Sequence, residues 1–335
     1  MLNGTRSLRR ASYGPLPMSK RIDIRLFDLD EVGPKVSKPA KRRRHLHVVE
    51  ISPQSRLNLD GAPLYFADDS LLLRGVQPHS ADKAIQVSRG LDTVSLAMSR
   101  QWFDVQYVET HCGPGLLLDE ESGQEVAGSP LQALNVSRPF RRYVFSDLST
   151  ECTSALSRRI GERPDVRVET GDANDRAHLE RVFGPLDPRA LTLVYLDPAC
   201  PSHLQFKTIE WLARRFNFLD LIINLPIHGL RRAVTGAGSS FEGPGAAGMF
   251  LAHPEPRRLL AVPDLIKALR DTYDEQLMNL GFLKPARRTV TFAGGAPYYD
   301  MLYVSKHPTA LKLWNNTNPV KVNPQLDLLS GDLAG

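Results

Sequence analysis

The stretch from Tyr107 to Leu118, YVETHCGPGLLL, places an acid, a His-Cys pair and Gly-Pro-Gly within twelve residues. An acid, a His-Cys pair and a Gly-Pro-Gly turn could form a metal or nucleophile site, a phosphate-binding turn, or the floor of a nucleoside-cofactor pocket. His111 and Cys112 have no further ligands at metal-binding spacing, and Cys152 and Cys200 lie far away in the sequence. We therefore predict no metal site, and the residues downstream must decide between the other interpretations.

Polar residues follow five apolar, strand-like runs. These endings are Glu109 with Gly113 and Gly115, then Asp147, then Asp172 with Asn174, then Asp197, and finally Asn224. In open α/β sheets, ligands bind outside the carboxyl ends of the strands. The five endings therefore predict one binding site, built at a single edge of a sheet.

The residue types fit a nucleoside cofactor. Gly113 and Gly115 let the backbone approach a ligand that a Cβ would exclude. Asp147, at the end of the second run, can accept both ribose hydroxyls, and Asp172 can accept the adenine amino group. Asn174 could assist, or it could cap the following helix. With S-adenosylmethionine the first loop faces a methionyl group rather than a pyrophosphate, so the absent third glycine of GxGxxG is no objection.

Asp197 is the candidate catalytic residue, because the fourth run ends beside the expected position of the sulfonium. It could orient the acceptor or take its proton, or it could simply cap a helix. Pro198, Asn224 and His228 are candidates for binding the acceptor. Cys200 follows in the same loop, but the Pro-Cys dipeptide of cytosine C5-methyltransferases is not reproduced, which favours a bystander thiol over a nucleophile.

The elements that must hold these residues are an alternation of strands and helices. The strand-like runs are FDVQYVET, RRYVFSD, DVRVETGD, ALTLVYLDP and LDLIINLP. Helical segments between them predict a parallel sheet covered on both faces. Helices are also predicted at Ser80–Arg100 and about Val262–Leu280, and ARRTVTFAG and YYDMLYVSK form a terminal hairpin. This is a Rossmann-like class I methyltransferase fold, a mostly parallel twisted sheet closed by a C-terminal antiparallel hairpin.

The distance from Gly115 to Asp147 is longer than such a fold usually has between its first two strands. The stretch LLLDEESGQEVAGSP is therefore expected to be an inserted loop, with the next helix beginning near Ser129 and Pro130. Residues 45–77 show only weak strands or loops.

Composition divides the chain into three parts. We expect a basic, disordered N-terminal extension over 1–60, a methyltransferase-like domain over 61–308 and a tail over 309–335, with a mobile Gly-rich loop or lid at about 229–255. Residues 1–44 hold 12 Lys and Arg against 4 Asp and Glu, although the whole chain has a net charge of only +5. The extension could be an arm for nucleic acid or an acidic partner, or merely solvated chain.

The remaining composition predicts a cytoplasmic protein. There is no apolar run long enough for a transmembrane helix and no secretory signal, and three scattered cysteines fit a reduced compartment. We therefore expect no membrane association.

Six motifs resemble those of the three-Cys-motif partner protein (TcmP) family, over roughly His79 to Asn316. These motifs are YVETHCGPG…GSPLQAL, RYVFSD, TGDAND, VYLDPA, LIINLP and YYDMLYVSKHPTALKLWN. The resemblance implies a class I methyltransferase-like fold. Glu109 stands where the family usually has Asp, THC replaces xFA, and DPAC replaces DPFG. The aromatic residue after Asp-Pro, which stacks on a flipped base in DPPY enzymes, is therefore missing. Phe241 or Phe250 of the Gly-rich loop could supply it.

The sequence thus predicts an S-adenosylmethionine-dependent methyltransferase whose acceptor is open, with nucleic acid or a nucleotide as the first hypothesis. The altered motifs support a second hypothesis, that of a non-catalytic methyltransferase-like subunit acting with a protein partner. A third, a NAD(P)-dependent oxidoreductase, is disfavoured by the terminal hairpin and the missing third glycine.

Overall fold

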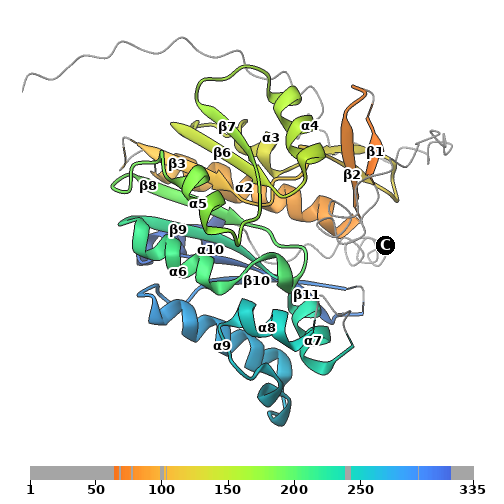
Figure 1. Ribbon diagram of the computed structural model, residues 1–335, viewed down its shortest axis with the longest axis vertical. Coiled ribbons are helices and arrows are strands. Elements are labelled where there is room, and N and C mark those ends of the chain that lie inside the picture. Colours follow the sequence, from red (N-terminus) through yellow and green to blue (C-terminus); the bar gives the residue numbers. More distant parts are fainter. Residues whose placement is uncertain are drawn as a thin grey trace, which may run out of the picture. The chain divides into compact units, whose positions relative to one another are not determined.

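The computed structural model describes residues 64–67, 69–76, 78–98, 102, 104–237, 243–292 and 294–317. The predicted extension over 1–60 lies outside these ranges, as do Phe241 and residues 318–335. Strands of two sheets and their covering helices make up the described part (Figure 1).

The larger sheet has seven strands, five of which are parallel neighbours. The strand order is β10 (Ala286–Thr291), β11 (Pro297–Val304), β9 (Leu219–Leu225), β8 (Leu191–Leu196), β3 (Val105–Glu109), β6 (Arg142–Asp147) and β7 (Val166–Thr170). Strand β11 runs antiparallel to both of its neighbours, whereas β9, β8, β3, β6 and β7 are mutually parallel. The five predicted parallel strands and the closing hairpin are confirmed.

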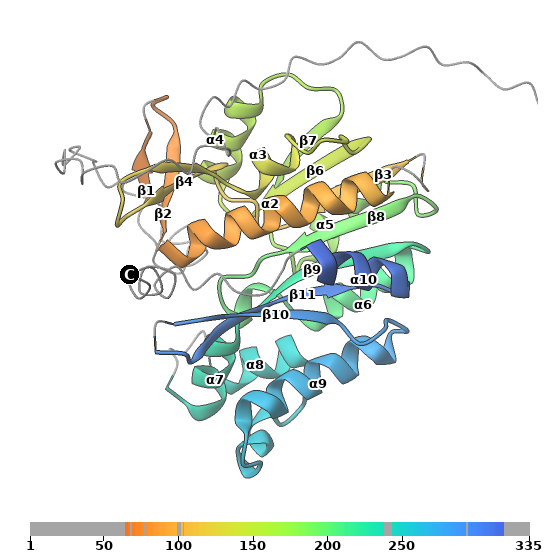
Figure 2. The same ribbon diagram turned by 180° about the vertical axis from the view of Figure 1, so that it is seen from behind.

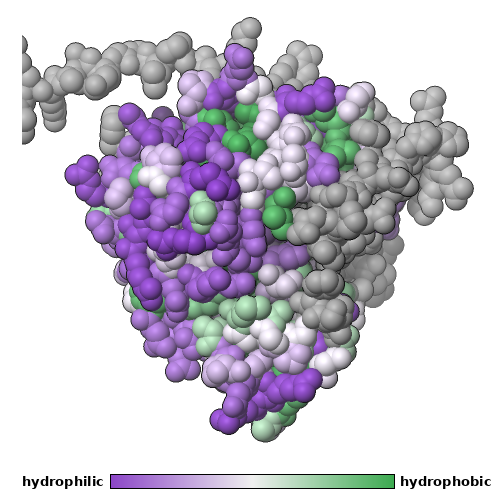
Figure 3. Space-filling model, in the orientation of Figure 1, coloured by the Kyte–Doolittle hydropathy of each residue, from purple (hydrophilic) through white to green (hydrophobic). Residues whose placement is uncertain are grey.

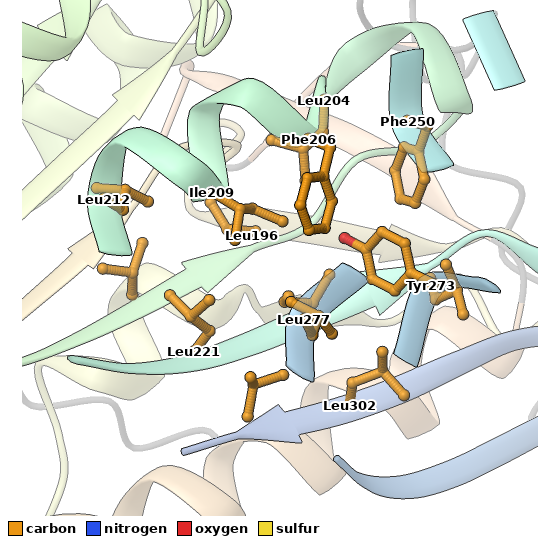
Figure 4. Packing of buried hydrophobic residues seen from close by; sticks show 14 of the residues in the cluster. Leu196, Leu204, Phe206, Ile209, Leu212, Leu221, Phe250, Tyr273, Leu277 and Leu302 are labelled. Carbon is orange, nitrogen blue, oxygen red and sulfur yellow. The ribbon is translucent and has the colours of Figure 1, made fainter. Parts of the chain in front are cut away.

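Alternating side chains on these strands feed two separate apolar layers, as a pleated strand requires. One layer packs under α5 (Arg176–Phe183), α6 (Phe206–Arg215) and α9 (Leu265–Asn279), and Figure 4 shows Tyr273 among Phe206, Phe250 and Leu277 in this layer. Helices α2 (Pro78–Met98) and α10 (Pro308–Thr317) lie against each other over the opposite face (Figure 2).

A second, four-stranded sheet stands where the sequence predicts only weak strands or loops. Its strands, in order, are β1 (Leu64–Phe66), β2 (Leu72–Val76), β4 (Leu116–Asp119) and β5 (Glu125–Ala127). The expectation of an inserted loop after Gly-Pro-Gly is wrong, because the insertion folds into the β4–β5 hairpin before α3 (Ser129–Ala133). LLLD pairs in parallel with β2, a partner some 40 residues earlier that local patterns do not reveal.

Arg159 of α4 (Thr150–Ile160) joins this small sheet to the Gly-Pro-Gly loop. Its guanidinium donates to the carboxylate of Asp69 and to the carbonyl oxygens of Leu72 and Pro114. The side chain is only 6% exposed, so these charge-assisted bonds are largely shielded from water. The loop therefore has a fixed support on its outer side.

The Gly-rich segment 229–255 is not a loop or lid over its described residues. It contains most of α7 (Ile227–Thr235) and all of α8 (Pro244–Leu251), and both helices bury apolar side chains in the core. Its small residues serve close packing. A Cβ on Gly248 would come within 2.8 Å of the carbonyl oxygen of His253. Glycine content alone therefore misled the prediction.

The segment predicted as a C-terminal tail begins with a packed helix. In α10, Trp314 is 2% exposed and stacks on Tyr303 with ring centroids 4.8 Å apart. The same indole lies so close to Gly90 of α2 that a Cβ there would approach it to 2.5 Å. The folded domain therefore extends through α10.

Within the described ranges, no helix combines the length and apolar character needed to cross a bilayer. The face seen in Figure 3 is mostly hydrophilic, and its hydrophobic residues form small separate groups. Such scattered apolar exposure is ordinary for a folded domain.

Candidate active site

The predicted site residues meet at the carboxyl edge of the parallel sheet. Glu109 is the last residue of β3 and pairs with Tyr195 of β8, so Asp197 lies just beyond it on the neighbouring strand. Asp147 ends β6, the neighbour of β3 on its other side. The sheet order thus brings three carboxyl groups from distant parts of the sequence to one edge.

Lys83 of α2 forms an ion pair with Asp197. The two side chains are only 16% and 20% exposed, and the ammonium also lies over the ring of Tyr299, 5.3 Å from its centroid. Burial by itself raises the pKa of Asp197, but the charge of Lys83 and its hydrogen bond outweigh it and hold this pKa below its ordinary value. Asp197 is therefore an ionised carboxylate at neutral pH.

Glu109 is fully buried and lies near the charges of Asp197 and Lys83. The hydroxyl of Ser129 donates to one of its carboxyl oxygens, and the hydroxyl of Tyr107 donates to the other at 3.3 Å. Burial raises its pKa well above the ordinary value, and the negative charge of Asp197 raises it further. The carboxyl has no contact with solvent, so the structure places Glu109 beneath the site rather than in its wall.

The two neighbouring acids are thus driven to opposite protonation states. Lys83 keeps Asp197 ionised, while burial and the charge of Asp197 favour a neutral Glu109. Environments that separate the pKa values of adjacent carboxyls are typical of sites with distinct acid and base roles. This arrangement depends on Lys83, which was not among the predicted site residues.

The Gly-Pro-Gly loop divides its two glycines between ligand access and packing. Gly113 has φ +61°, and a Cβ placed on it would meet no atom of the described residues within 4 Å, so among these residues the loop borders open space there. Gly115 has φ +87°, and its Cβ would come within 2.8 Å of Leu156. Both positive φ values favour glycine. Only Gly113 has the open approach expected of a cofactor contact.

Asp147 holds the loop in place. Its carboxylate accepts the N–H of Gly113 at 2.8 Å and the N–H of Ser149 at 2.9 Å, and the residue is 8% exposed. Each carboxylate oxygen keeps a further lone pair, so ribose hydroxyls could bind as well. The bonds give Asp147 a role in positioning Gly113, and its predicted contact with a ribose stays a prediction.

Asp172 and Asn174, which follow β7, form hydrogen bonds that hold neighbouring loops in place. Asp172 accepts the N–H of Asn174 at 2.8 Å. The amide of Asn174 donates to the carbonyl oxygen of His203 at 3.2 Å and accepts the N–H of Gln205 at 2.7 Å. Asp175, one residue later, caps α5. Asn174 therefore anchors the loop after β8, and its predicted contact with a cofactor stays a prediction.

His111 has two hydrogen-bond partners, and Cys112 and Cys152 are buried. The Nε2–H of His111 donates to the carbonyl of His203 at 3.2 Å, which leaves Nδ1 to accept the Thr110 hydroxyl at 2.9 Å. Burial lowers the pKa of His111, so the ring is neutral. Burial also raises the pKa of Cys112 well above its usual range and that of Cys152 to about 12. The described residues contain no group of three or more His, Cys, Asp or Glu suited to a metal.

The candidate acceptor-binding residues lie along the loop after β8, at the end of β9 and in α7. The amide nitrogen of Asn224 donates to the carbonyl oxygen of Pro198 at 3.3 Å, which fixes the Asp-Pro turn from below. The amide oxygen of Asn224 is buried and has no partner among the described residues. His228 lies in α7, half-buried against Phe292 and Tyr298.

Phe250, the aromatic residue that the sequence offers in place of the missing one, does not reach this edge. Its ring stacks on Tyr273 in the core, with centroids 5.2 Å apart, and the residue is 1% exposed. The expectation that it supplies the aromatic surface of the acceptor pocket is therefore wrong.

Three contributors to the site were not among the predicted site residues: Ser129, Lys83 and Tyr299. Ser129 could have been found from its place in the GSP motif, although its bond to Glu109 could not. Lys83 and Tyr299 approach Asp197 from a helix before the sheet and from the terminal hairpin. No local pattern links residues that far apart, so only the folded chain reveals them.

The chain matches no model of a known protein family, and no curated protein is significantly similar to it. Among solved structures, a Legionella pneumophila protein of the family DUF519 is 14% identical, with a TM-score of 0.42 over 70% of this chain and 90% of its own. The O-methyltransferase from Bacillus cereus in complex with SAH is 13% identical, with a TM-score of 0.39 over 68% and 91%. The Methanococcus jannaschii fibrillarin pre-rRNA processing protein is 13% identical, with a TM-score of 0.34 over 60% and 66%.

These similarities are low, so the fold class rests on the strand order of this chain. The sheet has seven strands, of which five are parallel neighbours, and an antiparallel strand lies next to one edge. This strand order defines a Rossmann-like α/β fold of the methyltransferase type.

Proposed function

We propose that this protein is an S-adenosylmethionine-dependent methyltransferase. One observation carries the proposal: the ion-paired Asp197, the open backbone at Gly113 and the carboxylate of Asp147 meet at the carboxyl edge of the sheet. Ligands of open α/β sheets bind at this edge. The resemblance of the sequence motifs to the three-Cys-motif partner family agrees with the proposal.

The residues present fit the cofactor. Gly113 offers a backbone surface without a side chain, and Asp147 and Asp172 offer carboxylates beside it for ribose hydroxyls and an amino group. When bound, the cofactor would supply an electrophilic methyl group on a sulfonium.

The chain's own contribution to the transfer is orientation. Asp197 is ionised and its pKa is lowered, so it is a weak proton acceptor but a good acceptor of hydrogen bonds. It would hold an N–H or O–H of the acceptor in line with the methyl group, because positioning is the main requirement of such a displacement. Lys83 fixes the carboxylate, and Asn224 fixes the Asp-Pro turn that follows it.

Calorimetry with S-adenosylhomocysteine tests the cofactor site. We expect the wild type to bind and Asp147→Asn to bind at least tenfold more weakly, since the amide loses the negative charge. Asp271→Asn, an exposed carboxylate on α9, is the matched control and should bind like the wild type. The absence of binding by the wild type would refute the proposal.

A non-catalytic methyltransferase-like subunit is the second candidate, favoured by the altered DPAC turn. Labelled methyl donor, supplied with nucleic acids, nucleotides and proteins in turn, separates the two. Cofactor binding without any methylated product, in the presence of the native partner, would favour the binding subunit. A fluorescence titration with NADH tests the oxidoreductase alternative, for which we expect no binding.

A further inference from the structure

Four aromatic rings lie next to one another at the sheet edge that carries Asp197. Phe292 and Tyr298 have ring centroids 4.6 Å apart, and His228 lies 5.1 Å from Phe292 and 6.2 Å from Tyr298. The ring of Tyr299 is 5.6 Å from that of Tyr298. We call Phe292, Tyr298 and His228 the aromatic platform.

The fold places this platform beside the candidate catalytic group. Asp300 of β11 pairs with Leu225, the last residue of β9, so the hairpin turn before it extends beyond the carboxyl ends of the parallel strands. Strand β11 packs against α7, and both lie at this end in the two opposite views (Figures 1 and 2). The hairpin has a β-bulge at Tyr298, so strict alternation of side chains does not hold there. The Tyr298 ring lies near His228, and the Tyr299 ring lies beneath the ammonium of Lys83.

Tyr298 and Tyr299 connect the aromatic platform to the ion pair of Lys83 and Asp197. The Tyr298 ring adjoins Tyr299, over which the ammonium of Lys83 lies at 5.3 Å while it pairs with Asp197. A flat group stacked on the platform would thus lie at the edge from which an acceptor atom can reach Asp197.

The platform remains accessible to a ligand. Phe292 is 37% exposed, while His228 and Tyr298 are half-buried. A hydrophobic ring exposed on a tight turn costs solvation free energy, so an apolar planar ligand would gain from covering it. Burial and the nearby charges of Arg231 and Arg232 lower the pKa of His228, which keeps its ring neutral and suited to stacking.

Charge selects the occupant. Arg231 is exposed on α7 three residues after His228, and Arg232 follows it. Aromatic rings interleaved with cations are the combination that binds single-stranded nucleic acid, where bases stack and phosphates meet positive charge. An uncharged protein surface would cover the rings but would not match the positive charge beside them.

We propose that the aromatic platform stacks an unpaired base of a single-stranded nucleic acid and presents it to the Asp197 edge. The proposal rests on the proposed methyltransferase function and names its acceptor class. It also supplies the aromatic surface that the DPAC turn lacks and that Phe250, buried in the core, does not provide.

Binding of oligonucleotides to the full chain tests the platform. The probes are single strands of roughly 12 nucleotides carrying 2-aminopurine, in RNA and DNA form, with the matching duplexes for comparison. We expect the single strands to bind with a change in 2-aminopurine fluorescence. Phe292→Ala and Tyr298→Ala should each weaken binding at least about fivefold, the loss of one stacked base.

Two control variants separate stacking from general damage. Tyr298→Phe keeps the ring and should bind like the wild type. Phe218→Ala removes a comparably exposed phenylalanine, 44% exposed just before β9 at the opposite end of that strand, and should also leave binding unchanged. Arg231→Gln should lower the slope of log affinity against log salt by about one.

Calorimetry with S-adenosylhomocysteine on the same proteins distinguishes the two proposals. Wild type that binds this ligand but no single strand, or platform variants that bind single strands as the wild type does, would overturn the nucleic-acid proposal and leave the cofactor proposal standing. Wild type that binds neither ligand would overturn both.

Discussion

Replacing Glu109 by glutamine should change how stability depends on pH. In the unfolded chain the carboxyl titrates near its ordinary value of 4.5, whereas burial raises the folded pKa well above it. Above pH 4.5 the native state therefore holds a proton that the unfolded chain releases. The contribution of this group to stability is complete below pH 4.5 and declines as pH rises through the folded pKa.

The magnitude follows from proton linkage. While Glu109 is protonated in the native state and ionised in the unfolded one, stability falls by about 1.4 kcal/mol per pH unit. Between pH 5 and pH 7 this site alone can cost up to roughly 2.7 kcal/mol, a large part of the stability of a typical domain. The glutamine side chain would remain neutral throughout, and its amide can still accept from Ser129 and donate to the oxygen of Tyr107.

Urea unfolding at pH 5, 6 and 7 measures the effect. The free energy of unfolding of Glu109→Gln, relative to wild type, should rise with pH by up to the amount above, with unchanged m-values. Glu162→Gln, at an exposed position, is the matched control and should show no such trend. Parallel pH profiles for wild type and Glu109→Gln would refute the neutral buried carboxyl.

Three further predictions concern the supports of the site and of the fold. Lys83→Met should lower stability by about 1–3 kcal/mol, less than a fully buried pair would lose, because both partners keep some exposure. A double-mutant cycle with Asp197→Asn should recover part of the loss, and additive effects would contradict the coupling. Gly115→Ala should cost about 1–2 kcal/mol for its left-handed backbone, plus the repacking of Leu156; a thermal melt unchanged from wild type would be the contrary result. Trp314→Ala should cost about 3–5 kcal/mol in urea unfolding, whereas an unstructured tail would lose nothing.

Periodicity and strand endings predicted the main frame of the fold. Apolar runs such as LTLVYL and LDLIINL are long enough to be recognised as buried strands, and the turn-separated final pair as a hairpin. Weaker signals failed. The Gly-rich segment forms α7 and α8 because its small residues pack closely, and the four-residue strand β4 exists because β2 pairs with it.

Sequence by itself determined which residue types end each strand. Because the carboxyl ends of parallel strands lie at one edge of the sheet, Asp147 and Asp197 were expected to meet there. Tertiary structure decided what these residues do there. Lys83 reaches Asp197 across more than a hundred residues of chain, and Glu109 loses its solvent under Ser129 and Tyr107. Protonation depends on burial and on charges within a few ångströms, and neither quantity is local in sequence. The same reason hid the aromatic platform until the hairpin and α7 were seen together.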